Sequence, residues 1–201
     1  MQTRIILGLI VAAFLLPPCA NAEDIYKIDP AHSSLTFSVR HMGISNVKGH
    51  FDEFSGTILL DNGAIREASG TIQVSSINTG VQQRDNHLRT PEFFDAASYP
   101  VITFKTRSVE KREGQTILIA DFTMRNVTRE LRLPVKLSGP IKDPQGNIRI
   151  GLEAVTNLNR KDYGINYSGA LETGALLVGD DVALEINAEA IKQISSALSA
   201  R

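Results

Sequence analysis

Short runs in which apolar and polar residues alternate recur along most of the chain. In the run 34–40, Leu35, Phe37 and Val39 fall on one face of an extended segment, and polar residues fall on the other. The other clear runs are 117–124, 131–137, 148–154 and 182–188, and weaker runs are 54–60, 71–75 and 101–105. About eight short alternating runs predict an all-β domain of antiparallel strands.

Turn residues separate the runs, and one segment breaks the pattern. The predicted turns are Asp61-Asn62-Gly63, Glu113-Gly114, Ser138-Gly139-Pro140 and Asp143-Pro144-Gln145-Gly146. Residues 82–98 lack strand periodicity and predict one or two short helical turns. Strands in this number form either a sandwich or a closed barrel, and periodicity alone does not choose between them. No linker or internal repeat divides the chain, so a single domain is expected.

The first 22 residues have the features of a secretory signal peptide. Arg4 precedes an apolar stretch, 5–16, which is followed by a proline pair and by Ala20-Asn21-Ala22. The stretch is shorter than the roughly 20 residues of a spanning helix, and no second candidate span follows. We therefore expect cleavage after Ala22 and a mature domain of residues 23–201. In the competing interpretation Cys19 carries a lipid, but Pro18 stands where a lipoprotein signal has a small residue.

Composition narrows the class of protein. Hydrophobic residues make up 42% of the chain and charged residues 21%, which is typical of a globular domain. The formal net charge is -1 and no basic run occurs, so nucleic acid is not expected as a partner. Cys19 is the only cysteine and lies in the signal peptide, so the mature chain has no disulfide. A disulfide-free exported domain fits the bacterial periplasm.

Several motifs occur in a characteristic order along the mature chain. They are Tyr26-Lys27-Ile28-Asp29-Pro30-Ala31-His32-Ser33-Ser34, Gly49-His50-Phe51-Asp52-Glu53-Phe54-Ser55-Gly56, Arg84-Asp85-Asn86-His87-Leu88-Arg89 with Phe93-Phe94-Asp95, Asp121-Phe122-Thr123-Met124, and Arg160-Lys161-Asp162-Tyr163-Gly164. Together they closely resemble the YceI family of secreted bacterial proteins. The resemblance implies a lipocalin-like antiparallel barrel that encloses a polyisoprenoid or similar long-chain lipid, often as a homodimer. It implies no known catalytic activity and no cofactor.

The inward faces of the predicted strands are the candidate lipid site. An eight-stranded barrel is either filled by its side chains or holds one elongated ligand, and the resemblance favours the ligand. Small residues on the inward stripes, Ala120, Val135, Ala154 and Ala188, would leave the space. The predicted interior contacts are Leu35, Phe37, Val39, Phe54, Leu118, Ala120, Phe122, Leu133, Val135, Leu152 and Ile186. Each buried methylene contributes about 0.8 kcal/mol, so a prenyl chain can bind without polar contacts.

Polar residues in two non-strand segments are candidates for the mouth of the barrel. They are Arg84, Asp85 and His87 in one segment, and Arg160, Asp162 and Tyr163 in the other. Loops on a rigid barrel can orient a ligand's polar end. In the alternative interpretation Asp85 caps a helical turn and pairs with an arginine, which ties the loop to the barrel.

Metal binding and catalysis have weak support in the sequence. His32, His41 and His50 are nine residues apart, a spacing that fits no zinc pattern, and His87 lies far along the chain. No Gly-x-Ser-x-Gly elbow occurs. We expect a periplasmic protein without metal that stores or carries a polyisoprenoid, with an isoprenoid quinone among the candidates. The alternatives are a hydrolase or isomerase of such a lipid, and a filled barrel that acts as an interaction module.

Overall fold

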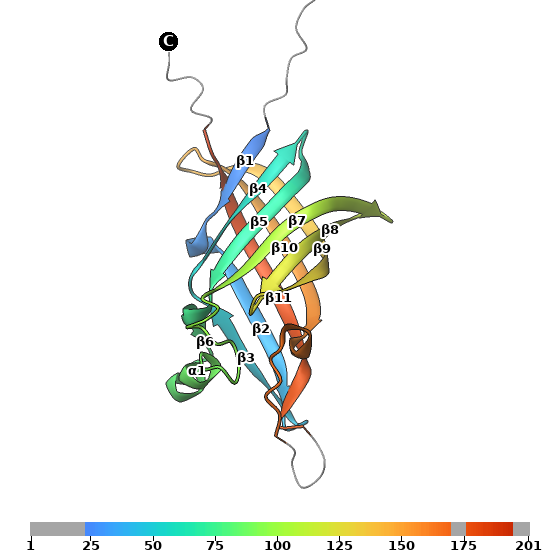
Figure 1. Cartoon of the computed structure of the whole chain (residues 1–201). Helices are drawn as coiled ribbons and strands as arrows, with labels where there is room; N and C mark the ends of the chain where they lie inside the picture. The colour runs from blue at the N-terminus through green and yellow to red at the C-terminus, as the bar shows by residue number, and fades with distance from the viewer. Residues whose placement is uncertain (1–22, 170–175, 195–201) are drawn as a thin grey trace, which may run out of the picture.

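The alternating runs become strands of one antiparallel sheet in the computed structural model, which describes residues 23–169 and 176–194 (Figure 1). The strands are β1 (Asp24–Ile28), β2 (Ser34–His41), β3 (Ser45–Phe51), β4 (Phe54–Asp61), β5 (Ala64–Gln73), β6 (Ile77–Asn78), β7 (Val101–Arg112), β8 (Gln115–Met124), β9 (Val127–Lys142), β10 (Ile148–Asn159) and β11 (Val178–Lys192). The helices are α1 (Gln82–Leu88) and the short 3₁₀ segments η1 (Pro30–His32), η2 (Val74–Ser76) and η3 (Arg160–Tyr163). The predicted signal peptide lies outside the described residues.

Eight of the strands close into a barrel. Their order around the ring is β1-β4-β5-β7-β8-β9-β10-β11, and β1 completes it by pairing with β11. Tyr26 therefore lies opposite both Ile58 of β4 and Lys192 of β11. β2 pairs with the other half of β11 and continues the sheet through β3 to β6. The closed ring confirms the predicted barrel and excludes the sandwich.

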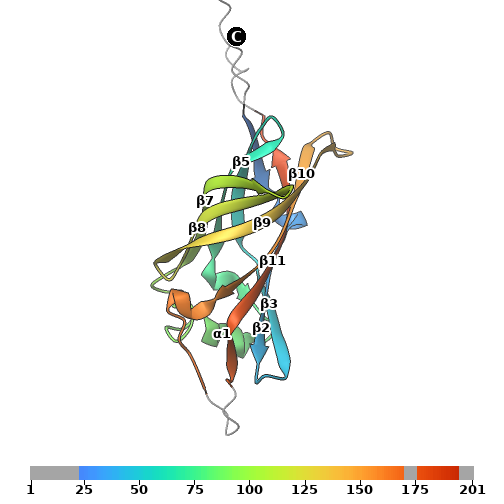
Figure 2. The same ribbon diagram turned by 90° about the vertical axis from the view of Figure 1, so that its right-hand side faces the viewer.

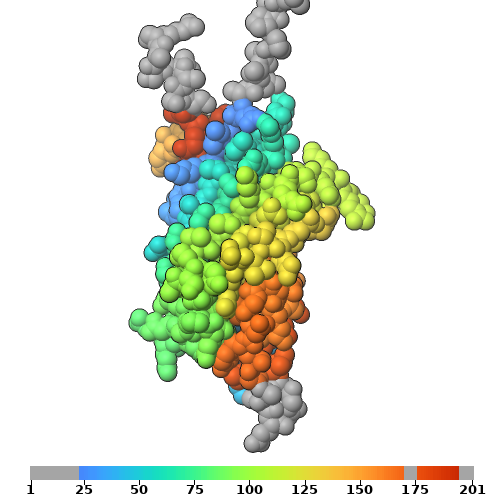
Figure 3. Space-filling model, viewed as in Figure 1, coloured from blue at the N-terminus to red at the C-terminus, as the bar shows by residue number. Residues whose placement is uncertain are grey.

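The two ends of the barrel differ. Figures 1 and 2 place the β4–β5 hairpin and the start of β1 at one end, and α1 with the β2–β3 hairpin at the other. The β7–β8 hairpin projects from the side of the barrel (Figure 3). None of the described helices has the length and apolar character needed to cross a membrane.

Four hairpin turns share the same unusual backbone. Two successive residues have positive φ at Met42-Gly43, Asn62-Gly63, Glu113-Gly114 and Arg125-Asn126. This conformation matches the right-handed twist of the flanking strands, which is why Asn and Gly favour it. The predicted turns at 61–63 and 113–114 are confirmed.

The predicted turn at Ser138-Gly139-Pro140 is wrong, because these residues lie inside β9. Gly139 has a φ of 96°, and a Cβ there would lie 2.9 Å from the carbonyl oxygen of Arg149. The register between β9 and β10 shifts at this point. The glycine therefore bends a continuing strand at an irregularity, and the chain reverses later, at 143–146.

β3 has no clean alternation in the sequence, and its packing explains why. A Cβ on Gly49 would lie 2.4 Å from the ring of Phe37 on β2. The ring covers the backbone where another strand would carry an inward side chain. An aromatic ring on one strand thus replaces the apolar residue that periodicity would require on its neighbour. The run predicted at 71–75 also differs from the structure, since β5 begins earlier, at Ala64, and ends at Gln73, where η2 follows.

Candidate ligand-binding cavity

An apolar cavity of about 250 Å³ occupies the interior of the barrel. One water needs only about 10–15 Å³ by the same measure. Residues of β11 from Val178 to Ala188 border the cavity, so at about 3.3 Å per residue it extends roughly 30 Å along the strand. Its wall is formed almost wholly by carbon atoms. A long, slender, apolar molecule matches this shape.

Every phenylalanine after residue 22 borders the cavity. They are Phe37, Phe51, Phe54, Phe93, Phe94, Phe104 and Phe122. The ring centroids of Phe37 and Phe51 lie 5.8 Å apart, and those of Phe51 and Phe94 lie 6.1 Å apart in an edge-to-face arrangement. The rings thus join β2 and β3 to the segment after α1, and they give the cavity a stiff wall.

Two glycines thin the wall that β4 and β5 form. Gly56 on β4 and Gly70 on β5 lie directly across from each other, and both border the cavity. A Cβ on Gly56 would lie 2.6 Å from the carbonyl oxygen of Ser69, whereas a Cβ on Gly70 would meet nothing closer than 3.4 Å. Gly56 therefore permits the close approach of the two strands, and Gly70 leaves open volume.

Nine of the eleven predicted interior residues border the cavity, namely Leu35, Phe37, Val39, Phe54, Leu118, Phe122, Leu133, Leu152 and Ile186. Ala120 and Val135 do not. Both are buried, with exposed fractions of 0% and 5%: Ala120 lies between Thr106 of β7 and Leu131 of β9, and Val135 belongs to the core cluster. Ala154 is buried in the same core as Val135, so of the four small residues predicted to leave space only Ala188 borders the cavity.

Arg84 and Asp85 hold a loop together and do not border the cavity. The carboxylate of buried Asp85 accepts hydrogen bonds from the backbone N–H and the hydroxyl of Thr79, at 2.9 and 2.5 Å. Arg84 donates to the Thr79 hydroxyl at 2.7 Å and to its carbonyl oxygen at 2.9 Å. Asp85 thus anchors the segment before α1 through Thr79 and not through an arginine. This role is close to the alternative in which Asp85 ties the loop to the barrel.

His87 lies outside the cavity as well. Its Nε2 is 2.5 Å from Oε2 of Glu92, and its ring packs edge-on against Phe93 and Tyr167 at 5.0 and 5.4 Å. Since Phe93 borders the cavity, His87 supports a wall residue from behind.

The three predicted residues of η3 differ in where they lie. Arg160 borders the cavity and is buried, and its guanidinium donates to the carbonyl oxygens of Ile165 and Gly179 at 2.6 and 2.9 Å and to Oδ1 of Asp180 at 2.9 Å. Tyr163 is buried edge-on against Phe122, and desolvation raises its pKa. Asp162 is exposed. Of the six predicted mouth residues, only Arg160 borders the cavity.

Several wall residues carry no periodic signal in the sequence. Leu88, Phe93 and Phe94 reach the cavity from α1 and the loop after it. A pair of adjacent phenylalanines in the longest non-strand segment is the one signal that could have indicated them. Gly70 has no side chain to reveal its position.

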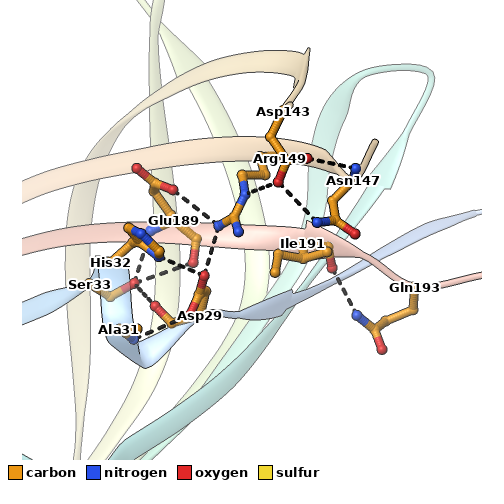
Figure 4. A network of polar contacts seen from close by, with 10 residues as sticks. All are labelled: Asp29, Ala31, His32, Ser33, Asp143, Asn147, Arg149, Glu189, Ile191 and Gln193. Carbon is orange, nitrogen blue, oxygen red and sulfur yellow. Dashed lines mark hydrogen bonds and ion pairs between the residues drawn. The ribbon is translucent and has the colours of Figure 1, made fainter. Parts of the chain in front are cut away.

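A cluster of charged residues lies outside the cavity, around Arg149 (Figure 4). Its guanidinium is 2.7 Å from Asp29 and 2.7 Å from Asp143, and 3.3 Å from Glu189. His32 lies 2.8 Å from Asp29. The hydrogen bonds of Arg149, followed by those of His32, lower the pKa of Asp29, and Arg149 also lowers the pKa of Asp143. The motif around Asp29 thus joins η1, β10 and β11.

No group of three or more His, Cys, Asp or Glu side chains within residues 23–169 and 176–194 is placed to hold a metal ion. Three of the four histidines pair with a carboxylate: His32 and His87 as described, and His50, which lies 3.0 Å from Asp52.

Comparison with known proteins places these features in a family. The sequence pattern of the YceI-like domain matches residues 26–190. A UPF0312 protein of Staphylococcus aureus strain N315 is 37% identical over 167 residues, which cover 82% of this chain and 95% of that protein. The crystal structure of the Campylobacter jejuni YCEI protein is 31% identical, covers 77% of this chain and 90% of its own, and superposes with a TM-score of 0.67. A polyisoprenoid binding domain from Saccharophagus degradans has the same fold, with a TM-score of 0.63 at 18% identity over 84% of this chain and 98% of that domain.

Proposed function

Because the chain belongs to the YceI-like family, we propose that it is a lipid-binding protein whose barrel encloses one long chain of the polyisoprenoid type. The observation that carries the proposal is the cavity itself, whose wall is apolar along roughly 30 Å of β11. A structural neighbour described as a polyisoprenoid binding domain supports the choice of ligand class.

The affinity would come from the chain more than from the head group. Burying each methylene contributes about 0.8 kcal/mol, so a chain of several prenyl units binds tightly without polar partners. Arg160 is the buried ionisable side chain at the wall, and backbone carbonyls and Asp180 already accept hydrogen bonds from it. A quinone or another small head group is therefore accommodated rather than tightly held.

Binding is favoured over catalysis by the chemistry of the wall. Among the described residues that border the cavity, the ionisable side chains are Arg160 and Glu185, and Glu185 is exposed. General acid–base or nucleophilic chemistry needs a placed pair of reacting groups. Carriage or storage of an unmodified lipid, in the periplasm, needs only the apolar cavity.

The test begins with the protein purified from its native compartment, extracted with organic solvent and analysed by mass spectrometry. We expect a stoichiometric long-chain isoprenoid lipid. The stripped protein should then take up a polyprenol in a saturable titration. Absence of both native lipid and saturable uptake would refute the proposal.

A matched pair of variants locates the binding site. Ala188 on β11 borders the cavity, and Ala183 on the same strand is exposed on the outer face. Ala188→Phe should reduce polyprenol affinity at least about tenfold, because the ring occupies ligand volume, without lowering the melting temperature of the stripped protein. Ala183→Phe should change neither quantity. Equal affinity in both variants would place the ligand elsewhere.

A further inference from the structure

The β2–β3 hairpin ends in exposed apolar side chains. Ile44 is 79% exposed and Met42 is 37% exposed at its tip. The backbone N–H of Met42 donates to the carbonyl oxygen of Leu177 at 2.9 Å, which brings the 41% exposed Leu176 close to the same tip. We name Met42, Ile44 and Leu176 the apolar tip. Figures 1 and 2 show that the hairpin lies at one end of the described part of the chain.

The other hairpins with the same backbone provide an internal comparison. Positive φ values at two successive residues occur with Asn62-Gly63, Glu113-Gly114 and Arg125-Asn126, which all lead with a polar residue. In the apolar tip the first of the two positions is Met42. Methionine gains nothing from the left-handed conformation, in which asparagine is favoured. The turn therefore does not require a methionine at this position, and an apolar side chain exposed at the tip of a hairpin indicates a contact outside the chain.

The tip has a fixed shape. The backbone N–H of Ile44 donates to the carbonyl oxygen of His41 at 3.1 Å. The guanidinium of Arg40 donates twice to the carbonyl oxygen of Gly43, at 3.1 and 2.8 Å. Because the turn is held by its own hydrogen bonds, little conformational entropy is lost when the apolar side chains meet a partner.

The charge around the tip favours an anionic surface. Residues 34–51 contain Arg40 and Lys48 and no acidic residue. Among the described residues at the neighbouring end of β11, Asp180 is already paired with two cations, and Asp181 is an exposed carboxylate. Apolar side chains flanked by basic ones are the combination that binds the interface of an anionic membrane.

The cavity ends beside the tip. Val39 and Val178 border it, and Val178 lies opposite His41, the last residue of β2. A lipid that left or entered the barrel at this end would do so close to the surface that Met42 and Ile44 contact.

We propose that the apolar tip docks the protein on an anionic lipid bilayer, with Met42 and Ile44 inserted between head groups and acyl chains. The inference rests on the proposed function, because the bound ligand is itself a membrane lipid. A second copy of the chain is a poorer occupant, because a symmetric contact would bring the basic residues of one hairpin against those of the other.

The test is flotation with vesicles of phosphatidylcholine alone or with roughly a third phosphatidylglycerol. The variant Met42→Asn/Ile44→Thr should partition onto the anionic vesicles at least about tenfold more weakly than the unaltered protein. Asparagine suits the left-handed position, so the variant should keep its melting temperature. Ile141→Thr is the matched control, since Ile141 on β9 is 64% exposed, and it should float like the unaltered protein.

The vesicles contain no prenyl lipid, so docking is measured independently of the cavity. The tip variant should take up polyprenol in detergent with unaltered affinity. If neither the unaltered protein nor any variant takes it up and no native lipid is found, the proposed function is refuted, and the flotation result still decides docking. Docking would be overturned if the unaltered protein floats with neither vesicle, or if the tip variant floats equally well. A dimer in sedimentation that the tip variant dissociates would assign the tip to a second copy.

Discussion

The smallest residues decide how closely two strands approach beside the cavity. A methyl group on Gly56 would lie 2.6 Å from a backbone carbonyl oxygen, and backbone moves less readily than a side chain. We expect Gly56→Ala to lower the free energy of unfolding by about 1–3 kcal/mol. Gly70→Ala, directly across the strand pair, should stay within about 0.5 kcal/mol of the unaltered protein.

Urea unfolding of the lipid-stripped proteins measures both changes, and the shift of the midpoint at constant slope gives the difference. Equal destabilisation by the two substitutions would show that the strands approach no more closely at Gly56 than at Gly70.

Ala120 shows that an inward position need not border the cavity. The residue is fully buried between its strand neighbours Thr106 and Leu131, whereas Leu118 and Phe122 on the same stripe border the cavity. Ala120→Phe should therefore overpack the core and lower stability by about 1–3 kcal/mol, as measured by thermal unfolding of the stripped protein. Unchanged stability combined with lost polyprenol uptake would mean that Ala120 does face the ligand.

At the scale of elements, the ion pairs of Arg149 hold together three segments of the chain at one end of the barrel. The groups around it come from the residue before η1, the turn after β9, and β11. Arg149→Met leaves these carboxylates without their shared cation. We expect the melting temperature at neutral pH to fall by several degrees.

The same cluster predicts how stability depends on pH. The pKa values of Asp29 and Asp143 are lowered in the folded state, principally by hydrogen bonds from Arg149. Their contribution is therefore complete above the unfolded pKa of about 4, and is lost as the pH falls through the folded values. Between about pH 5 and about pH 2, the melting temperature of Arg149→Met should fall less than that of the unaltered protein.

Arg107→Met serves as the control, because Arg107 forms an exposed pair with Asp121 at 3.2 Å. Such pairs contribute about 0–1 kcal/mol, so its acid response should match that of the unaltered protein. An unchanged acid response in Arg149→Met would instead assign the loss of stability to other carboxylates.

The elements show what alternation can and cannot predict. The strongest runs became β2, β8, β9, β10 and β11 because alternate side chains of each strand point into the barrel, toward the core or the cavity. Alternation did not predict β3, because the ring of Phe37 fills the space above Gly49 where an apolar side chain would otherwise lie. Gly139-Pro140 was mistaken for a turn because a bend within a strand uses the same residue types as a reversal of the chain.

The candidate site was predictable where it is made of strands. Most of the predicted interior residues border the cavity because alternation fixes which side chains point inward. The polar residues of α1 and η3 were harder to assign. Their chemistry suits a ligand's head group and a loop anchor equally well, and only contacts such as those between Asp85 and Thr79 distinguish the two roles.

At the scale of the whole molecule, export should leave the barrel intact. β1 begins at Asp24, after the expected cleavage site, and its pairing with β4 starts at that residue. We expect the exported protein to begin at Glu23, as measured by intact mass. A mature chain that starts at Cys19 with an attached diacylglycerol would replace secretion in free form with lipid anchoring, and retention of Met1 would contradict export.

The pairing of β1 with β11 also determines when the protein can fold. Tyr26 of β1 pairs with Lys192 of β11, so the barrel can close only after synthesis has reached residue 192. Contacts so distant in sequence give a high contact order, and such topologies fold in milliseconds to seconds rather than microseconds. Until then the strand edges and phenylalanine-rich inner faces are uncovered, and they are prone to aggregate. The chain is therefore most prone to aggregation during biogenesis, before the barrel closes. A chaperone that holds the nascent chain would have its greatest effect at this stage.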